Sequence, residues 1–354
     1  MPDTKPSPDK PYAALALQLA AQSLEAVADP RAAMLKMIGD VGTKMRSALI
    51  FLQQYGGSPV RLVVLPEYLF SSYPGRISIA DFAKAVAWDI DGPEYEALGK
   101  IASAQKLFLA GNAYERDKNF PGLYFQTSFV VAPSGNVVLR YRRLNSMYAP
   151  SPHDVWSKYL DIYGLDGVFP VARTEIGNLA AIASEEILYP EIARAHALRG
   201  AEVFVHSSSE VGSPMATNKD IAKYARAFEN MAYVVSANTA GITGTPMPVA
   251  SADGNSLVID WKGNRLAESN TGETFTAFAD IDIAGLRRAR RKPGMINYLS
   301  RQRTEAFAAV YAGATHQRAN ALIGAGGVVT IPDRDHFNRV QAETIERLAK
   351  DGLI

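Results

Sequence analysis

The stretch LAAIASEEILYPEIARAHALRGAEVFVHSSSE, residues 179–210, contains two apolar runs separated by an amphipathic segment. Residues 179–183 and 202–206 each predict a buried strand, because short apolar runs bounded by polar or turn residues are typical of strands inside a sheet. The segment 190–200 begins with proline, which suits the first helical position, and ends with glycine, which suits the position after a helix. The stretch therefore predicts a strand–helix–strand unit, with Ser184 directly after the first strand.

The rest of the chain continues this alternation. A helix is predicted from Asp29-Pro30 to Tyr55, where Gly56-Gly57 ends it, and a turn at Pro133–Asn136 joins two paired strands. The mixture of strand–helix alternation and hairpins favours a layered α/β sandwich with a mixed sheet over a purely doubly wound fold. The further strands are predicted at Tyr12–Leu19, Arg61–Leu65, Leu107–Ala110, Ser128–Ala132, Val137–Tyr141, Tyr233–Ala237, Ser256–Ile259 and Thr276–Ile281, the last two around a turn at Lys262–Asn264.

The composition excludes several classes of function. The chain has 354 residues, of which 47% are hydrophobic, and its 37 Lys+Arg against 36 Asp+Glu give a net charge of +1. The chain has no basic surplus of the kind that would indicate a nucleic-acid partner. Cysteine is absent, which excludes disulfides, zinc–thiolate sites and thiol nucleophiles. The histidines are scattered without a ligand pair at helical spacing, so neither a metal site nor a cofactor is expected. They are His153, His196, His206, His316 and His336.

The first residues, 1–11, form a polar, proline-rich tail without the apolar centre of a signal peptide. The apolar stretch Ala13–Ala21 is interrupted by Gln18 and is shorter than the ~20 residues that span a bilayer. We therefore expect a soluble, cytoplasmic protein without a membrane partner.

Three polar residues follow apolar strands: Glu67 follows RLVVLP, Arg143 follows VVLRYR, and Ser184 follows LAAIA. Strand ends of an α/β sheet are common positions for functional sites. A carboxylate, a cation and a hydroxyl supply a general base, an anion stabiliser and a nucleophile. Each residue alone also has a simpler interpretation: a cap or ion-pair partner for Glu67, a solvated arginine cluster for Arg143, and a small loop residue for Ser184.

Seven segments in order resemble the nitrilase (carbon–nitrogen hydrolase) superfamily, from roughly Tyr12 to Asp282. They are Gln18, RLVVLPEYLF, AGNAYER, VVLRYRRL, the stretch IASEEILYPEIARAHALRGAEVFVHSSSE, ARAFENMAYVVSANTAG, and DGNSLVIDWKGNRLAE. The resemblance implies a four-layer α-β-β-α sandwich. In that family a cysteine attacks a nitrile or amide carbon, a glutamate takes its proton, and a lysine stabilises the tetrahedral intermediate. The matching positions here hold Ser184, Glu67 and Arg143.

The resemblance also implies domains, assembly and further site residues. A nitrilase-like domain is expected at 12–286 and a helical, interface-forming extension at 287–354, with the helix after Pro190 and this extension as contacts of a homodimer or larger homo-oligomer. Many members carry a second acid soon after the lysine. The predicted substrate-binding residues are Asp154, His153, Tyr148 and Trp156, from the segment NSMYAPSPHDVW, together with Glu186. The adjacent Arg142 and Arg143 suggest a carboxylate-bearing or phenolic ligand.

The two substitutions leave several functions open. A serine hydroxyl holds its proton more tightly than a thiol, a glutamate (reference pKa ~4.3) is a weak base for it, and arginine does not shuttle protons. One interpretation is a nitrilase-like enzyme acting on a small amide, nitrile or related compound through an atypical triad. Others are a non-covalent hydratase, lyase or isomerase using Glu67, and a catalytically inactive, ligand-binding pseudoenzyme. An introduced Cys-to-Ser change at 184 is opposed by the concerted Arg143 and the absence of every other cysteine.

Overall fold

Strand β1 (Tyr12–Ala16) is buried on both faces, which explains its unbroken apolar sequence. Side chains alternate along a strand. Ala14 and Ala16 therefore enter one hydrophobic core, shared with a second sheet, while Leu15 enters another core beneath the helix α1 (Pro30–Tyr55). The computed structural model describes residues 10–25, 27–55, 57–210, 217–252, 254–314 and 316–354.

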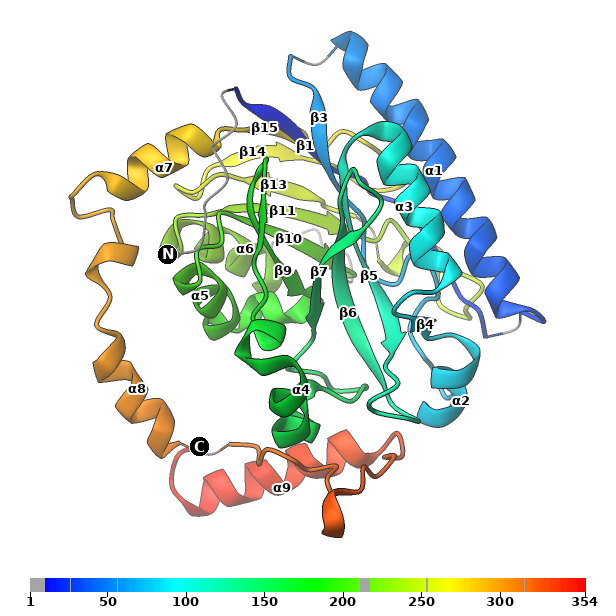
Figure 1. The fold of residues 1–354 in the computed structure, drawn as a ribbon, viewed down its shortest axis with the longest axis vertical. Helices are drawn as coiled ribbons and strands as arrows, with labels where there is room; N and C mark the ends of the chain where they lie inside the picture. Colours follow the sequence, from blue (N-terminus) through cyan, green and yellow to red (C-terminus); the bar gives the residue numbers. More distant parts are fainter. Residues whose placement is uncertain (1–9, 26, 56, 211–216, 253, 315) are drawn as a thin grey trace.

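The first sheet has the strand order β15-β1-β3-β5-β6-β7, with β4 paired to β5. It is mixed: β1, β3 and β5 run parallel, whereas β5–β6–β7 form an antiparallel meander and β15 pairs antiparallel with β1. Helices α1 and α3 (Pro93–Gln105) lie along its outer face, and α2 (Ile79–Ala85) lies near one end (Figure 1). The strands are β3 (Val60–Val64), β4 (Trp88–Asp89), β5 (Phe108–Arg116), β6 (Tyr124–Val131), β7 (Val137–Arg142) and β15 (Phe278–Ile281).

The second sheet has the order β14-β13-β11-β10-β9-β8, with a parallel centre. The parallel connections carry the helices α5 (Pro190–Leu198) and α6 (Asn218–Glu229), as expected for crossovers between parallel strands. The strands are β8 (Ala172–Thr174), β9 (Gly177–Ala183), β10 (Val203–Ser208), β11 (Tyr233–Asn238), β13 (Leu257–Ile259) and β14 (Arg265–Glu268). A small extra sheet joins β2 (Ala21–Gln22) to β12 (Ile242–Thr243).

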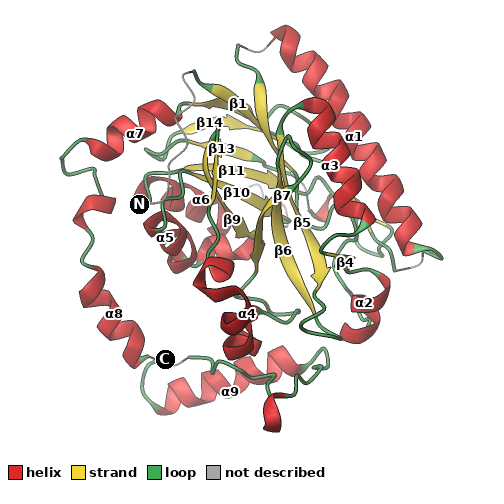
Figure 2. Cartoon of the chain, viewed as in Figure 1, coloured by secondary structure: helices red, strands yellow, loops and turns green. Residues whose placement is uncertain are grey.

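The two sheets stack with helices outside both of them (Figure 2), which confirms the predicted four-layer α-β-β-α sandwich. One prediction about the late strands was wrong. The turn at Lys262–Asn264 joins β13 to β14, whereas β15 pairs with β1 in the other sheet. Apolar pattern alone identifies a strand but does not assign it to one of two stacked sheets.

The C-terminal part leaves the sandwich and runs around one side of it (Figure 1). Helix α7 (Ile283–Arg291) crosses the predicted boundary at 286/287 and binds the sandwich through Arg287, whose Nε lies 2.6 Å from Glu202 Oε1. Helix α8 (Thr304–Gly313) buries none of its residues, whereas α9 (His336–Lys350) buries Phe337 and Leu348.

The remaining short elements connect the sandwich layers and the C-terminal part. They are α4 (Trp156–Val168) and the 3-10 helices η1 (Pro152–Val155), η2 (Ser184–Leu188), η3 (Val249–Ser251), η4 (Leu299–Arg301) and η5 (Ala325–Gly327). Among the helices of the described ranges, none is both long enough and apolar enough to cross a bilayer.

Candidate active site

Glu67 follows β3 and Pro66 and is completely buried. Gln126 Nε2 donates to its Oε1 at 2.5 Å, and Ser209 Oγ donates to its Oε2 at 2.6 Å. Thr239 Oγ1 donates to the backbone carbonyl of Glu67 at 2.7 Å and fixes the loop. Both carboxylate oxygens thus accept hydrogen bonds, which hold the side chain in one orientation.

Arg143 directly follows β7, and every nitrogen of its guanidinium has a partner. Nε donates to the Asn145 carbonyl at 2.6 Å, Nη1 donates to Gln126 Oε1 at 2.8 Å, and Nη2 lies 2.5 Å from Glu185 Oε1. Nη1 also lies 3.7 Å from Glu67 Oε1. Burial alone lowers the pKa of Arg143, but the carboxylates of Glu185 and Glu67 outweigh burial and hold that pKa above the ordinary arginine value. Arg143 therefore stays charged and connects both carboxylates.

Arg142 points away from this site. Its Nη1 lies 2.7 Å from Asp117 Oδ2 and its Nη2 lies 2.9 Å from Glu115 Oε1. Consecutive residues at the end of a strand face opposite sides of the sheet. The interpretation that Arg142 and Arg143 together favour a carboxylate ligand was therefore wrong, because they face different sides and both are already paired with acids.

Ser184 is the first residue after β9, is buried, and has a φ of +49°. This left-handed conformation is uncommon for a residue other than glycine, and such conformations cluster at functional sites. Within the described ranges, no group accepts a hydrogen bond from Ser184 Oγ. The hydroxyl therefore lies at a tight strand-to-helix turn and has no hydrogen-bond acceptor among the described residues.

The ring of His206 contacts the backbone carbonyl of Ser184 and not its hydroxyl. Its Nε2 lies 2.8 Å from the Ser184 carbonyl oxygen, so this nitrogen carries the proton, and Nδ1 accepts from Ser236 Oγ at 2.8 Å. Burial, with a smaller contribution from Lys223, lowers the pKa of His206 to about 3. His206 is thus neutral, has no free acceptor, and is not a base for Ser184.

Glu67 and Arg143 are in contact at strand ends of the first sheet, and Ser184 follows a strand of the second sheet. The prediction that they lie at the ends of neighbouring strands was wrong in detail: β5 and β6 separate β3 from β7, and β9 belongs to the second sheet. Arg143 makes the connection, since it contacts Glu67 on one side and Glu185, the neighbour of Ser184, on the other. All three residues are buried, but only Arg143 among them lines the cavity described next, so its lining does not confirm the prediction that all three face one cavity.

A cavity of about 510 Å³ lies next to Gln126 and Arg143. Gln126 and Arg143, which touch Glu67, form its buried polar part. Four tyrosines line it, namely Tyr68, Tyr73, Tyr114 and Tyr148. The C-terminal part supplies a further wall with Arg334, Asp335 and Asn338. The cavity therefore has a buried polar end, an aromatic middle and a charged mouth.

The structure places only Tyr148 among the predicted substrate-binding residues in this lining. Asp154 instead caps η1, because its Oδ2 accepts from the backbone N of Ser151 at 2.8 Å and from its hydroxyl at 2.9 Å. The carbonyls of His153 and Asp154 bind the C-terminal part, and Trp156 begins α4. His153 and Asp154 thus hold the extension against the sandwich through their backbone carbonyls.

Glu186 lies inside the protein and positions the loop that carries Arg143. Its Oε1 accepts from the backbone N of Leu144 at 2.9 Å and of Asn145 at 2.8 Å, and its Oε2 accepts from Tyr141 at 2.7 Å. Burial raises the pKa of Glu186, and Arg143 and the hydrogen-bond donors offset only part of that rise. Glu186 was predicted to bind substrate, but both of its carboxylate oxygens accept hydrogen bonds from the protein itself.

Three contact residues of the site were not predicted: Gln126, Glu185 and Ser209. Gln126 had a recognisable signal, because it is an amide inside the otherwise mostly apolar, fully buried strand YFQTSFVV. Glu185 and Ser209 lay beside predicted elements, but nothing local indicated which way their side chains point.

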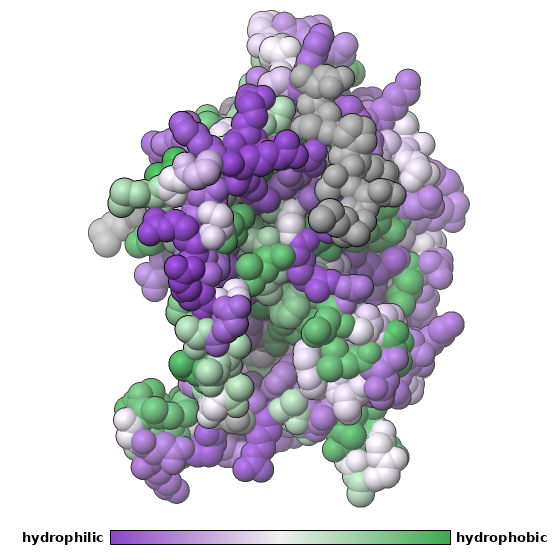
Figure 3. All heavy atoms as spheres, turned by 60° about the vertical axis from the view of Figure 1, so that its left-hand side comes forward, coloured by the Kyte–Doolittle hydropathy of each residue, from purple (hydrophilic) through white to green (hydrophobic). Residues whose placement is uncertain are grey.

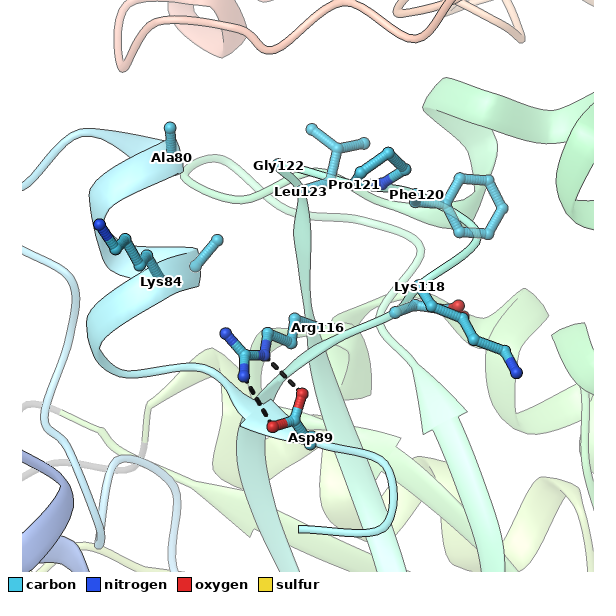
Figure 4. Close-up of a pocket in the computed structure, with 11 residues that line it drawn as sticks. Ala80, Lys84, Asp89, Arg116, Lys118, Phe120, Pro121, Gly122 and Leu123 are labelled. Atoms are coloured by element: carbon cyan, nitrogen blue, oxygen red, sulfur yellow. Dashed lines mark hydrogen bonds and ion pairs between the residues drawn. The ribbon is translucent and has the colours of Figure 1, made fainter.

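A second cavity of about 360 Å³ lies beside α2 (Figure 4). Arg116 and Asp89 face each other there in a bidentate ion pair, with distances of 2.5 and 2.7 Å. None of the proposed catalytic residues lines it. Across the described residues, no cluster of three or more His, Asp or Glu side chains is arranged to hold a metal ion.

Comparisons with known proteins agree with this architecture. A family model described as carbon-nitrogen hydrolase matches residues 16–291. A formamidase of Helicobacter acinonychis is 26% identical over 230 residues, covering 62% of this chain and 64% of the formamidase. A formamidase of Bacillus thuringiensis is 28% identical over 232 residues, with the same two coverages of 62% and 64%. The chain thus spans about 64% of the length of these curated relatives.

The fold is also similar to that of solved structures. Saccharomyces cerevisiae Nit3, described as a member of branch 10 of the nitrilase superfamily, matches with a TM-score of 0.61 at 19% identity, covering 82% of this chain and 96% of Nit3. At this identity the likeness concerns the fold alone. The family model, however, covers most of the chain and includes Glu67, Arg143 and Ser184. The chain belongs to the carbon–nitrogen hydrolase family.

Proposed function

We propose that this chain is an enzyme that hydrolyses a non-peptide carbon–nitrogen bond in a small amide or nitrile. One observation carries the proposal: a buried carboxylate, Glu67, is held by Gln126, Arg143 and Ser209, and the first two of these line a cavity that fits a small molecule. Ligand sites commonly combine an apolar cavity with a few convergent polar groups. Family membership and the formamidase relatives support the same reaction class.

In the proposed reaction with an amide, Ser184 Oγ attacks the carbonyl carbon while Glu67 takes the hydroxyl proton. The tetrahedral intermediate then loses the amine, which receives that proton from Glu67, and an ester on Ser184 remains. Water, deprotonated by Glu67, hydrolyses the ester and restores the serine. Arg143 holds the carboxylates of Glu67 and Glu185 in place and stabilises the negative charge that develops on the substrate in the tetrahedral intermediate.

A second function has a specific observation in its favour. Ser184 Oγ donates to no acceptor within the described ranges, whereas Glu67 is held by several groups. Glu67 on its own suits non-covalent acid–base chemistry, such as hydration, elimination or isomerisation. In that case Ser184 serves as a small residue that leaves space for the substrate.

The two functions separate in one experiment. Ammonia release is measured across a panel of short amides and nitriles with the parent chain, Ser184→Ala, Ser184→Cys and Glu67→Gln. Covalent hydrolysis predicts loss in Ser184→Ala, partial retention in Ser184→Cys, loss in Glu67→Gln, and an acyl adduct on Ser184 by intact-mass spectrometry. Retained turnover in Ser184→Ala favours the non-covalent function. No turnover of any compound contradicts hydrolysis and leaves a ligand-binding protein.

We further propose that the chain forms a homodimer through α5 and the C-terminal part. Helix α8 exposes Phe307, Val310 and Tyr311 by 53%, 71% and 59%, although their sequence is apolar. A groove of about 520 Å³ lies between α5 and α8. Figure 3 brings this side of the molecule forward, and apolar side chains gather in a hollow of this face. A second copy of the chain would cover this surface.

A further inference from the structure

The outer wall of the cavity comes from a segment far from the catalytic residues in sequence. Asp335 and Asn338, at the start of α9, and Arg334 just before them line the cavity together with Arg143 and Gln126. At about 510 Å³ the cavity falls within the range of about 300–1,000 Å³ that holds drug-sized ligands. A substrate that fills it therefore reaches from Gln126 and Arg143, which contact Glu67, to the C-terminal segment.

Arg334 fixes this wall in place. Its Nε donates to the Ile77 carbonyl at 2.6 Å, and its Nη1 donates to the Tyr124 hydroxyl at 2.7 Å and to the Tyr148 carbonyl at 2.9 Å. The remaining nitrogen, Nη2, is buried and has no hydrogen-bond partner among the described residues. The guanidinium of Arg334 is thus largely engaged by the protein, with one donor left unpaired.

Asp335 is the charged group that remains available at the mouth. Its side chain is exposed, caps no backbone N–H of α9, and forms no ion pair within the described part of the chain. The neighbouring Asp333 differs, because it is paired with Arg339 at 3.0 Å and does not line the cavity. A ligand group that meets Asp335 therefore meets an uncompensated carboxylate.

The tyrosines that line the cavity also favour a positively charged ligand group. Arg143 contributes one positive charge but contacts two carboxylates, Glu67 and Glu185. Of the charged residues that line the cavity, Arg143 and Arg334 are positive and Asp335 is negative, and the charge of Arg143 is compensated by its contacts with Glu67 and Glu185. Tyrosine rings line the path between the two ends, and aromatic faces attract cations. A substrate with a negatively charged tail would meet repulsion from the Asp335 carboxylate.

We propose that Asp335 is a specificity-determining residue and that the substrate is an amide or nitrile with a positively charged amino group at the end distant from the scissile bond. The apolar body of this substrate packs between Tyr68, Tyr73 and Tyr148, and its ammonium group binds the Asp335 carboxylate. This inference rests on the proposed hydrolytic function and specifies its substrate class.

The test uses the full chain and straight-chain amides in matched sets, from ω-aminobutanamide to ω-aminooctanamide. Each amino amide is compared with an uncharged amide in which a methyl group replaces the ammonium, and with the corresponding monoamide of a dicarboxylic acid. The parent chain should prefer the amino amide at one or more chain lengths. Asp335→Asn should raise KM for that amide about fivefold, the effect of an exposed ion pair, and leave kcat and the uncharged amide unchanged.

Asp333→Asn is the matched control, because it removes the same charge from the same segment outside the cavity. It should leave the preference intact. Equal preference for the three classes at every length, or an equal effect of both variants, overturns the inference. If no amide is hydrolysed, calorimetric binding of the same compounds decides the question. Ammonium binding that depends on Asp335 then supports this inference while the hydrolytic function fails, and no such dependence overturns both.

Discussion

Arg143 and Glu185 form an ion pair with 2.5 Å between Nη2 and Oε1, on the side of Arg143 opposite Glu67. Glu185 directly follows Ser184, so this pair joins the strand end of one sheet to that of the other. The planar fork of arginine reaches partners in several directions at once, whereas an ammonium group is a compact point charge. Arg143 thus holds the site together as much as it supplies charge.

Replacement of Arg143 by lysine should destabilise the fold even though the charge is kept. Lysine cannot reach Asn145, Gln126 and Glu185 together, so two charged hydrogen bonds are lost and the free energy of unfolding should fall by roughly 2–3 kcal/mol. Urea denaturation measures the change. Arg61→Lys, in a solvent-exposed pair with Glu175, is the control and should change stability by less than about 0.5 kcal/mol. Equal effects of both variants would contradict this role of Arg143.

Gln126→Ala should lower kcat by roughly 10²-fold with little change in KM. Gln126 both donates to Glu67 and accepts from Arg143, so its loss frees the base from the orientation that the reaction needs. Steady-state kinetics on the best amide of the panel provides the measurement. Thr127→Ala, the next residue in the same buried strand, is the control, since its hydroxyl bonds the Phe125 carbonyl and not the site. A normal kcat in Gln126→Ala would refute the positioning role.

His206 should remain neutral, with the proton on Nε2, down to about pH 4. Burial lowers its pKa to about 3 from 6.5, so the unfolded chain takes up a proton that the folded chain refuses. This contribution to stability is fully present above pH 6.5 and is lost as the pH falls from 6.5 towards 3. Imidazole ¹⁵N NMR reports the tautomer and charge.

The variant His206→Gln isolates this effect, since a glutamine amide can donate to Ser184 O and accept from Ser236 without titrating. Its free energy of unfolding should fall less than that of the parent chain between pH 6.5 and about pH 4.5, by at most about 1.4 kcal/mol per pH unit. Protonation of His206 above about pH 5 in the folded chain would disprove the assignment.

Val310→Asp on α8 should convert the proposed dimer to monomers. A charge at this position opposes burial of the apolar face against a second copy. Light scattering coupled to size-exclusion chromatography measures the mass at micromolar concentration. Val328→Asp is the control, because Val328 is 66% exposed and lies outside both α5 and α8. A parent chain that is already monomeric contradicts the proposal outright.

Much of the sandwich was predictable because its strands are apolar runs with definite ends. Pro66 after β3, Pro190 at the start of α5 and Gly200 after it mark boundaries that the backbone must respect. The strand-end positions of Glu67, Arg143 and Ser184 followed from those boundaries. These signals do not identify which strands pair with each other, so the prediction placed β15 beside the wrong strand.

The remaining site residues depend on contacts between distant segments. Gln126 bonds Glu67 across 59 positions of sequence, and Arg334 bonds Tyr148 across 186. Neither contact leaves a local pattern. Side chains alternate along a strand, so Arg142 and Arg143 could have been predicted to point in opposite directions. The interpretation of a joint arginine site overlooked this alternation. Asp154 was assigned to the site by resemblance, whereas its local sequence, Ser-x-x-Asp, already predicts a capping box.

The cavity wall formed by residues 334–338 has a consequence for how the protein becomes active during its synthesis. The ribosome delivers the sandwich strands before residues 334–338, and chains fold progressively as they emerge. A nascent chain can thus assemble Glu67, Arg143 and Ser184 while the cavity mouth is still open. Under the proposed function, the candidate catalytic residues would thus be in place before residues 334–338 close the cavity.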